Sequence, residues 1–141
     1  MNYNPFSFIS CQEDALVLAG CISHGFDADV IKKSGNLFAT ARAMLLDACV
    51  CLLYRQGGDS MSMQGLVDLL QNDISHNEDQ DMPSIKAAYD KIEADGATVE
   101  EDLGLKRYRM FQAIAYGETA ISVELDLYAK LSAMADRPLV G

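Results

Sequence analysis

The sequence contains no glycine-rich phosphate-binding loop and no nucleophile motif. The patterns Gly-x-x-x-x-Gly-Lys-Ser/Thr, Gly-x-Gly-x-x-Gly and Gly-x-Ser-x-Gly are all missing from the 141 residues. Such loops bind nucleotide phosphates through backbone N–H groups or place a reactive serine on a sharp turn. Their absence excludes the common nucleotide-binding and serine-hydrolase sites. We therefore expect no cofactor and no catalytic residue in this chain.

Spacings typical of metal ligands are also missing. The four cysteines form no Cys-x-x-Cys pair, and the two histidines, His24 and His76, lie far apart in the sequence. Cys49 and Cys51 fall two residues apart in a helical pattern, which directs their side chains to different faces. We expect small apolar core residues at these positions and no metal site.

The first residues lack the basic, apolar and small-residue regions of a secretory signal, so we expect a cytoplasmic chain with reduced cysteines. About half of the 141 residues are hydrophobic, enough for one domain spanning residues 1–141. Residues 1–9 are unusual for a chain end because "YNPFSFI" is apolar and aromatic. Asn4-Pro5 disfavours helix there, so we expect an extended lead-in segment.

The remaining pattern predicts an all-α fold, a compact bundle of about six helices around one long central apolar helix. A capping box at Ser10-x-x-Glu13 predicts a helix to His24, before an exposed connection over residues 25–35. Ser62 caps a short helix that ends in the polar run "QNDISHNEDQDMP". Pro83 suits the first position of a fourth helix, which Gly96 ends, and Thr98-x-x-Glu101 opens a fifth.

The central helix is "NLFATARAMLLDACVCLLYRQGG", which Gly57-Gly58 ends. Leu45 and Leu52 lie on its apolar face and should be buried. Arg42 and Asp47 near its middle would each cost roughly 2.5 to 3.5 kcal/mol in a bilayer, which favours a buried bundle helix over a membrane span. A sixth helix from about Thr119 should bury a stripe of Ile121, Leu125 and Tyr128, with Leu131 and Met134 beside it.

The negative charge is concentrated in one segment. Eleven of the 21 acidic residues lie between Asp68 and Asp102, where only two lysines oppose them, so this segment carries a net charge of −9 out of −10. Two interpretations remain open: a solvated helix with its flanking loops, or a docking surface for a basic partner. If a partner docks here, the expected contacts are Glu78, Asp79, Asp81, Glu100, Glu101 and Asp102.

One basic cluster contains an aromatic residue, Lys106-Arg107-Tyr108-Arg109. Lys106, Arg107 and Arg109 could hold a single strand of nucleic acid beside a stacking ring, or could be exposed charges around a core tyrosine. A strongly acidic chain is a poor electrostatic match for phosphates, so we expect weak binding at best.

The order of these segments resembles the helical insertion domain of type IV coupling proteins, the TraG/TraD-like conjugation ATPases. The resemblance rests on "YNPFSFI", "LFATARAMLLDACVCLLY", "SMQGLVDLL" and "YRMFQAIAYGETAISV". The positions that match the family motifs are Asn4, Pro5, Phe6, Phe38, Ala41, Leu45, Leu46, Ala48, Tyr108, Phe111, Gly117, Thr119, Ser122 and Val123. Ala39 replaces a frequent tryptophan and Glu118 the usual lysine.

The resemblance implies a substrate-recognition domain at the cytoplasmic end of a membrane-anchored, hexameric DNA-translocating ATPase. Its partner would be a relaxase or another secretion substrate with its DNA, and the Walker loop of the ATPase would lie outside this segment. The "YNPFSFI" aromatics would then pack against neighbouring parts of the parent protein. A freestanding helical DNA-binding regulator or protein-interaction domain and a small enzyme are the alternative classes.

Overall fold

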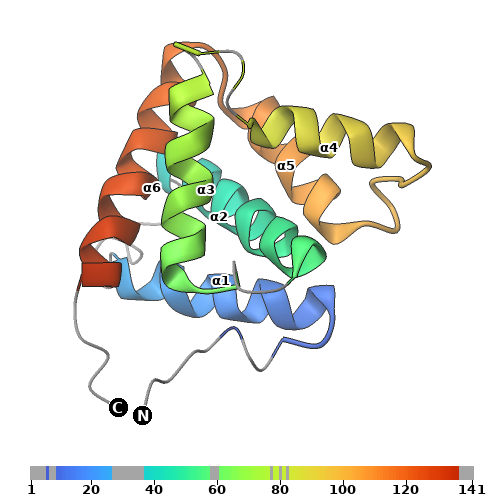
Figure 1. The fold of residues 1–141 in the computed structure, drawn as a ribbon, viewed down its shortest axis with the longest axis horizontal. Helices are drawn as coiled ribbons and strands as arrows, with labels where there is room; N and C mark the ends of the chain where they lie inside the picture. The colour runs from blue at the N-terminus through green and yellow to red at the C-terminus, as the bar shows by residue number, and fades with distance from the viewer. Residues whose placement is uncertain are drawn as a thin grey trace.

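The computed structural model describes residues 6, 9–26, 37–57, 61–76, 78, 79, 81 and 83–136, and this part of the chain is all-helical. It forms a bundle of six helices, as the sequence predicts (Figure 1). The helices are α1 (Gln12–Phe26), α2 (Leu37–Gln56), α3 (Met63–His76), α4 (Ile85–Ala94), α5 (Leu103–Ile114) and α6 (Glu118–Asp136).

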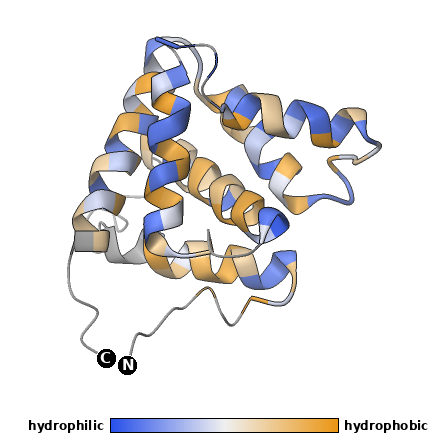
Figure 2. Ribbon diagram, in the orientation of Figure 1, coloured by the Kyte–Doolittle hydropathy of each residue, from blue (hydrophilic) through white to orange (hydrophobic). Residues whose placement is uncertain are grey.

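Helix α2 is the centre of the bundle, where it packs against α1, α3, α5 and α6. Figure 2 shows it as predominantly hydrophobic along its length. Leu45 and Leu52 are buried, as expected, and Gly57 follows the helix with a positive φ of 66°. A left-handed residue is a common helix stop, and glycine adopts it without a steric cost.

Two smaller helix pairs complete the bundle. Helices α3 and α6 pack side by side, and α4 packs against α5 (Figure 1). The buried guanidinium of Arg42 on α2 donates to the carboxylate of Asp126 on α6 at 2.7 Å. The arginine that interrupts the apolar pattern of α2 therefore links two helices of the bundle.

By length and composition, α2 is the one helix among the described residues that could cross a membrane. Half of its 20 residues are buried by the rest of the bundle. The apolar run is thus explained by its position as the core helix.

Most of the lead-in segment and residues 27–35 of the predicted connection lie outside the described residues, and α1 runs two residues past its predicted end, to Phe26. Within the lead-in, Phe6 is fully buried in the core and Ile9 packs against it. Phe6 therefore finds its burial within this chain, contrary to the expectation that neighbouring parts of a parent protein would cover it.

Two predicted helix starts are wrong in detail. Asp14, rather than Glu13, reaches back to the Ser10 backbone N–H and hydroxyl. Pro83 precedes the α4 cap instead of opening the helix, because the Ser84 hydroxyl accepts from the Ala87 N–H and makes Ser84 the N-cap.

The capping box at Thr98 is also wrong. Residues 98–101 form a turn, and α5 begins only after Asp102, whose carboxylate accepts from the Leu105 N–H. By contrast, Ser62 caps α3 as predicted, accepting from the Gly65 N–H. Helix α3 runs to His76, so the first half of the predicted polar run is helical.

The buried face of α6 differs from the predicted stripe. Ile121 is 48% exposed and Leu125 47%, whereas Val123, Leu127 and Leu131 are fully buried. Two apolar stripes with helical spacing run along this helix, and packing against α3 and α2 selects the second one.

Candidate functional site

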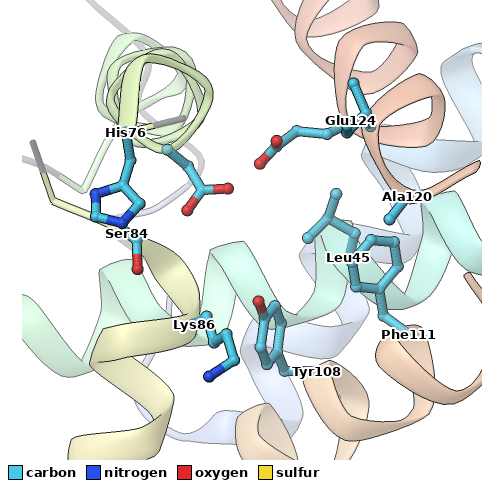
Figure 3. Close-up of a pocket in the computed structure, with 10 residues that line it drawn as sticks. Leu45, His76, Ser84, Lys86, Tyr108, Phe111, Ala120 and Glu124 are labelled. Atoms are coloured by element: carbon cyan, nitrogen blue, oxygen red, sulfur yellow. The ribbon is translucent and has the colours of Figure 1, made fainter. Parts of the chain in front are cut away.

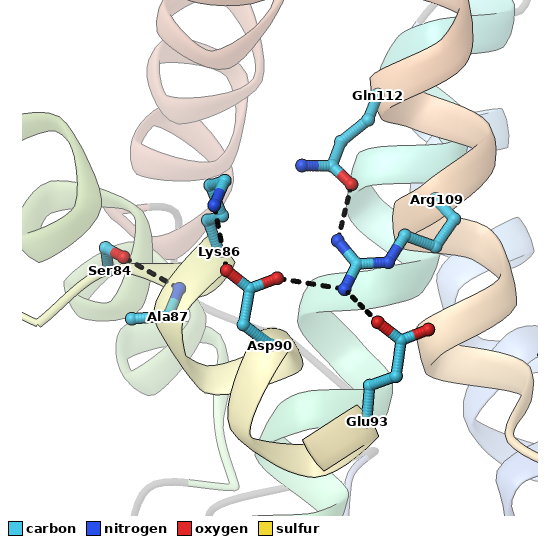
Figure 4. Close-up of polar contacts among 7 residues, drawn as sticks. All are labelled: Ser84, Lys86, Ala87, Asp90, Glu93, Arg109 and Gln112. Carbon is cyan, nitrogen blue, oxygen red and sulfur yellow. Dashed lines mark hydrogen bonds and ion pairs between the residues drawn. The ribbon is translucent and has the colours of Figure 1, made fainter. Parts of the chain in front are cut away.

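Three of the eleven acidic residues between Asp68 and Asp102 pair with cations on or beside α4. On α4, Asp90 accepts from Lys86 at 2.8 Å and from Arg109 at 2.9 Å, and Arg109 also contacts Glu93 at 3.0 Å (Figure 4). Lys91 and Asp95 form a further pair on the same helix. Opposite charges four residues apart on a helix are neighbours, and Arg109 adds a bridge from α5. These carboxylates are therefore occupied by this chain's own cations.

Asp102 has a structural position that the sequence did not reveal. It is buried, forms an ion pair with Arg55 of α2, and accepts from the side-chain amide of Gln12 on α1. It is also the N-cap of α5. Asp102 thus joins three helices at the end of the bundle, and its carboxylate is not presented to a partner.

The other five predicted contacts lie on exposed turns at the two ends of α4. Glu78, Asp79 and Asp81 follow α3, and Glu100 and Glu101 precede α5 (Figure 1). All five are exposed, and among the described residues none has an ion-pair partner. The ten residues of α4 separate the two turns by about 15 Å.

The predicted nucleic-acid contacts are mostly occupied. Arg107 lies 3.7 Å from the carboxylate of Asp47 on α2, and Arg109 is held by Asp90 and Glu93. Lys106 is exposed. The structure therefore leaves one exposed cation in this cluster, while Tyr108 is buried and stacks on Tyr89 with ring centroids 5.2 Å apart.

A cavity of about 250 Å³ lies where α3, α4, α5 and α6 meet above Leu45 of α2 (Figure 3). Its wall combines apolar and polar groups. The lining residues are Leu45, Asp73, His76, Ser84, Lys86, Tyr108, Phe111, Ala120, Ile121 and Glu124.

Two carboxyl groups from different helices meet in this cavity. Glu124 of α6 is only 8% exposed, and its carboxyl group points into the cavity in Figure 3. It shares a hydrogen bond with Asp73 of α3, whose other contact is the Ile85 N–H at 2.6 Å. Burial, and then the facing Asp73 carboxylate, raise the pKa of Glu124 well above 4.5. The raised pKa favours the protonated form of Glu124, whose carboxyl group then shares its proton with the facing carboxyl group.

Sequence reasoning missed this pair. Asp73 lies in a polar run that predicts a loop, and Glu124 lies off the face of α6 that the apolar pattern predicts to be buried. A signal was present: Glu124 falls three residues before Leu127 and seven before Leu131, at the spacing of one buried face. A single acid within such a stripe indicates a buried carboxyl group.

The two cysteines of α2 are core residues and not reactive thiols. Cys49 and Cys51 are buried, and desolvation raises the pKa of Cys51 to about 12 and that of Cys49 in the same direction. Such thiols are poor nucleophiles because the thiolate is disfavoured. Among the described residues, no group of three or more histidine, cysteine or carboxylate side chains could hold a metal ion.

Comparisons with models of known protein families, with curated protein sequences and with solved structures gave no match.

Proposed function

We propose that this chain is a substrate-recognition module, the all-α insertion domain of a TraG/TraD-like conjugation coupling protein, which docks a relaxase or another basic secretion substrate. In this proposal the chain itself is not an enzyme. It would act at the cytoplasmic face of a membrane-anchored, hexameric ATPase, without touching the bilayer.

The proposal rests on one observation: the acidic side chains that form no ion pair within the described residues include two exposed groups. Glu78, Asp79 and Asp81 form one such group, and Glu100 and Glu101 another. An interface of about 800 Å² on each partner is wide enough to contact both ends of α4. Proteins that handle DNA usually expose basic surface, so a relaxase is a suitable electrostatic partner.

The alternative of a DNA-binding regulator is less well supported. Arg107 and Arg109 already form ion pairs with carboxylates, and the chain as a whole carries a net charge of −10, which repels phosphate. Net neutralisation of phosphates is what drives non-specific DNA binding, and one exposed lysine supplies little of it.

Surface plasmon resonance against the relaxase of the same mobile element tests the proposal. Replacing Glu78, Asp79 and Asp81 by Gln, Asn and Asn should slow association and flatten its salt dependence, because exposed charges chiefly set the on-rate. A variant with Glu13→Gln and Glu118→Gln removes two exposed charges outside the acidic segment and is the control. An unchanged on-rate in the triple variant at low and high salt would mean that the acidic turns are only solvated and do not dock a partner.

The gene offers a second test. Codons upstream of this segment should encode a Walker loop, and codons downstream the rest of an ATPase. A natural start at Met1 together with a stop codon after Gly141 would contradict the insertion-domain proposal.

A further inference from the structure

We propose that the cavity between α3 and α6 receives a guanidinium group, the side chain of an arginine on the docked partner, between the carboxyl groups of Asp73 and Glu124. This inference deepens the proposed function by naming the anchor residue of the partner, and it rests on that function for the partner's identity. The cavity's preference for guanidinium is testable without the partner.

Glu124 has unmet hydrogen-bonding capacity. More than nine-tenths of this residue is buried, and its carboxyl group points into the cavity (Figure 3). Within the described residues, no N–H group donates to it, and its polar neighbour is another carboxyl group, that of Asp73. A buried carboxylate is costly unless it is paired with a cation or takes up a proton. Without a ligand, Glu124 takes up the proton.

The carboxyl group of Asp73 also has an oxygen available for a ligand. Its Oδ1 accepts from the Ile85 N–H, which fixes the carboxylate at the start of α4. The other oxygen is left for Glu124 or for a ligand. Two acceptors held by separate helices across a cavity match a planar donor with several N–H groups.

The walls of the cavity favour guanidinium over ammonium. Tyr108 and Phe111 contribute aromatic rings, and Leu45 and Ala120 contribute apolar surface. Guanidinium is more weakly hydrated than ammonium and packs on aromatic faces, so it enters such a cavity at a lower desolvation cost. Ile121, which is half exposed, lines the cavity and gives it access to solvent.

Four other titratable groups line the cavity with Glu124 and bear on the pH dependence of binding. They are Asp73 and His76 on α3, Lys86 on α4 and Tyr108 on α5. Lys86 is held by Asp90. Burial raises the pKa of Tyr108, so its hydroxyl stays protonated. Entry of a guanidinium therefore releases the proton of Glu124 to solvent, and binding should tighten by up to roughly tenfold for each pH unit until the pH reaches the raised pKa of Glu124, about 9.

The test is an NMR titration of the whole chain with acetyl-Gly-Arg-Gly-amide, following the methyl groups of Ala120 and Ile121. We expect saturable shifts below about 10 mM peptide, and tighter binding at pH 8 than at pH 6. The citrulline analogue, which has the same shape but no charge, should cause no saturable shift. Equal binding of the citrulline peptide, or no saturation with the arginine peptide at pH 8, would overturn the inference.

Variants separate a binding role from a structural one. Glu124→Gln keeps the shape and the neutral hydrogen bond of the unliganded state, so it should fold while losing at least tenfold in peptide affinity. Glu13→Gln is the control, because it removes an exposed charge on α1. Histidine also ordinarily changes charge near neutral pH. The peptide affinity of His76→Gln should therefore still depend on pH, whereas that of Glu124→Gln should not. A pH dependence that is lost in His76→Gln and kept in Glu124→Gln would contradict the role of Glu124.

The two proposals fail in different ways. Peptide binding without any relaxase binding would support the guanidinium site in the cavity and contradict the relaxase as the partner. Relaxase binding that is unaffected by Glu124→Gln, together with no peptide binding, would remove the cavity site and leave the acidic turns as the docking surface.

Discussion

Tyr89 of α4 occupies the space that a side chain at Gly104 of α5 would need. A Cβ at Gly104 would lie 2.5 Å from the Tyr89 hydroxyl oxygen and 2.8 Å from the Cβ of Cys51. That hydroxyl donates to the carbonyl of Ala48 at 2.6 Å, so it is fixed against the central helix. The glycine within α5 is required by close packing of α2, α4 and α5, although glycine lowers helix propensity.

Gly104→Ala should therefore destabilise the fold despite the better helix propensity of alanine. Overpacking costs roughly 1 to 3 kcal/mol, and urea unfolding measures it. Gly20 on α1 is the matched control, because a Cβ there meets no atom within 4 Å. Gly20→Ala should stabilise by about 0.5 to 1 kcal/mol. Stabilisation by both substitutions would contradict the close approach of Tyr89.

Leu45→Ala should cost roughly 2 to 5 kcal/mol of unfolding free energy, through lost burial and the cavity left behind. Leu45 is 1% exposed at the centre of the bundle, whereas Leu37 on the same helix is 69% exposed. Leu37→Ala should therefore change stability by less than about 0.5 kcal/mol. Equal effects of the two substitutions would place α2 at the surface.

Glu124 should make stability depend on pH in a defined direction. Above about pH 4.5 the unfolded chain loses this proton while the folded chain keeps it, because the pKa of Glu124 is raised in the fold. The folded state then binds more protons, so the free energy of unfolding falls as pH rises.

Glu124→Gln removes this dependence because glutamine does not titrate. Its advantage over the unmodified chain should grow by at least about 1 kcal/mol between pH 4.5 and pH 8, measured by urea unfolding. Asp47, whose pKa burial raises to about 6, acts in the same direction but is present in both proteins. A constant difference across this range would contradict the protonated state of Glu124.

Asp102 should affect stability, and Glu101 beside it should not. Asp102→Ala removes the N-cap of α5 and the partner of Arg55, at a cost of roughly 1 to 3 kcal/mol. Asp102→Asn keeps a capping oxygen and should cost less. Glu101→Gln is exposed and should stay within about 0.5 kcal/mol in thermal or urea unfolding. Unchanged stability in Asp102→Ala would mean that this carboxylate does not stabilise the fold.

Binding of single-stranded DNA should be weak and should depend on Lys106. Fluorescence anisotropy with a labelled oligonucleotide should give a Kd above about 100 µM at physiological salt. Lys106→Ala should weaken this further, whereas Arg109→Ala should leave it unchanged, because Asp90 and Glu93 already hold that guanidinium. Tight binding that Arg109→Ala abolishes would favour the DNA-binding regulator.

Much of the fold could be predicted because its determinants are local. The apolar spacing of α2, the Ser62 cap and the stop at Gly57 depend on residues within a few positions of each other. Local sequence does not fix a helix start where several capping residues follow one another. Thr98 and Asp102 both have suitable side chains, and the contacts of Asp102 with Arg55 and Gln12 decide between them.

The candidate sites could likewise be predicted only in part from the sequence. Net charge located the acidic segment, but not which of its carboxylates are exposed. Asp90 lies on a polar helix face in the sequence, yet Arg109, 19 residues away, occupies it. An ion pair of this kind forms only when two helices pack at a particular distance and rotation, which the charge pattern of either helix does not specify.

The sequence by itself determined six helices, the central position of α2 and the burial of Leu45 and Leu52, because helical periodicity and local capping are properties of neighbouring residues. The tertiary structure alone decided which stripe of α6 faces inward. Ile121 and Leu125 on one side, and Val123 and Leu127 on the other, are both spaced for burial. Packing of α6 against α3 selected the second stripe and thereby brought Glu124 against Asp73, 51 positions away in the chain.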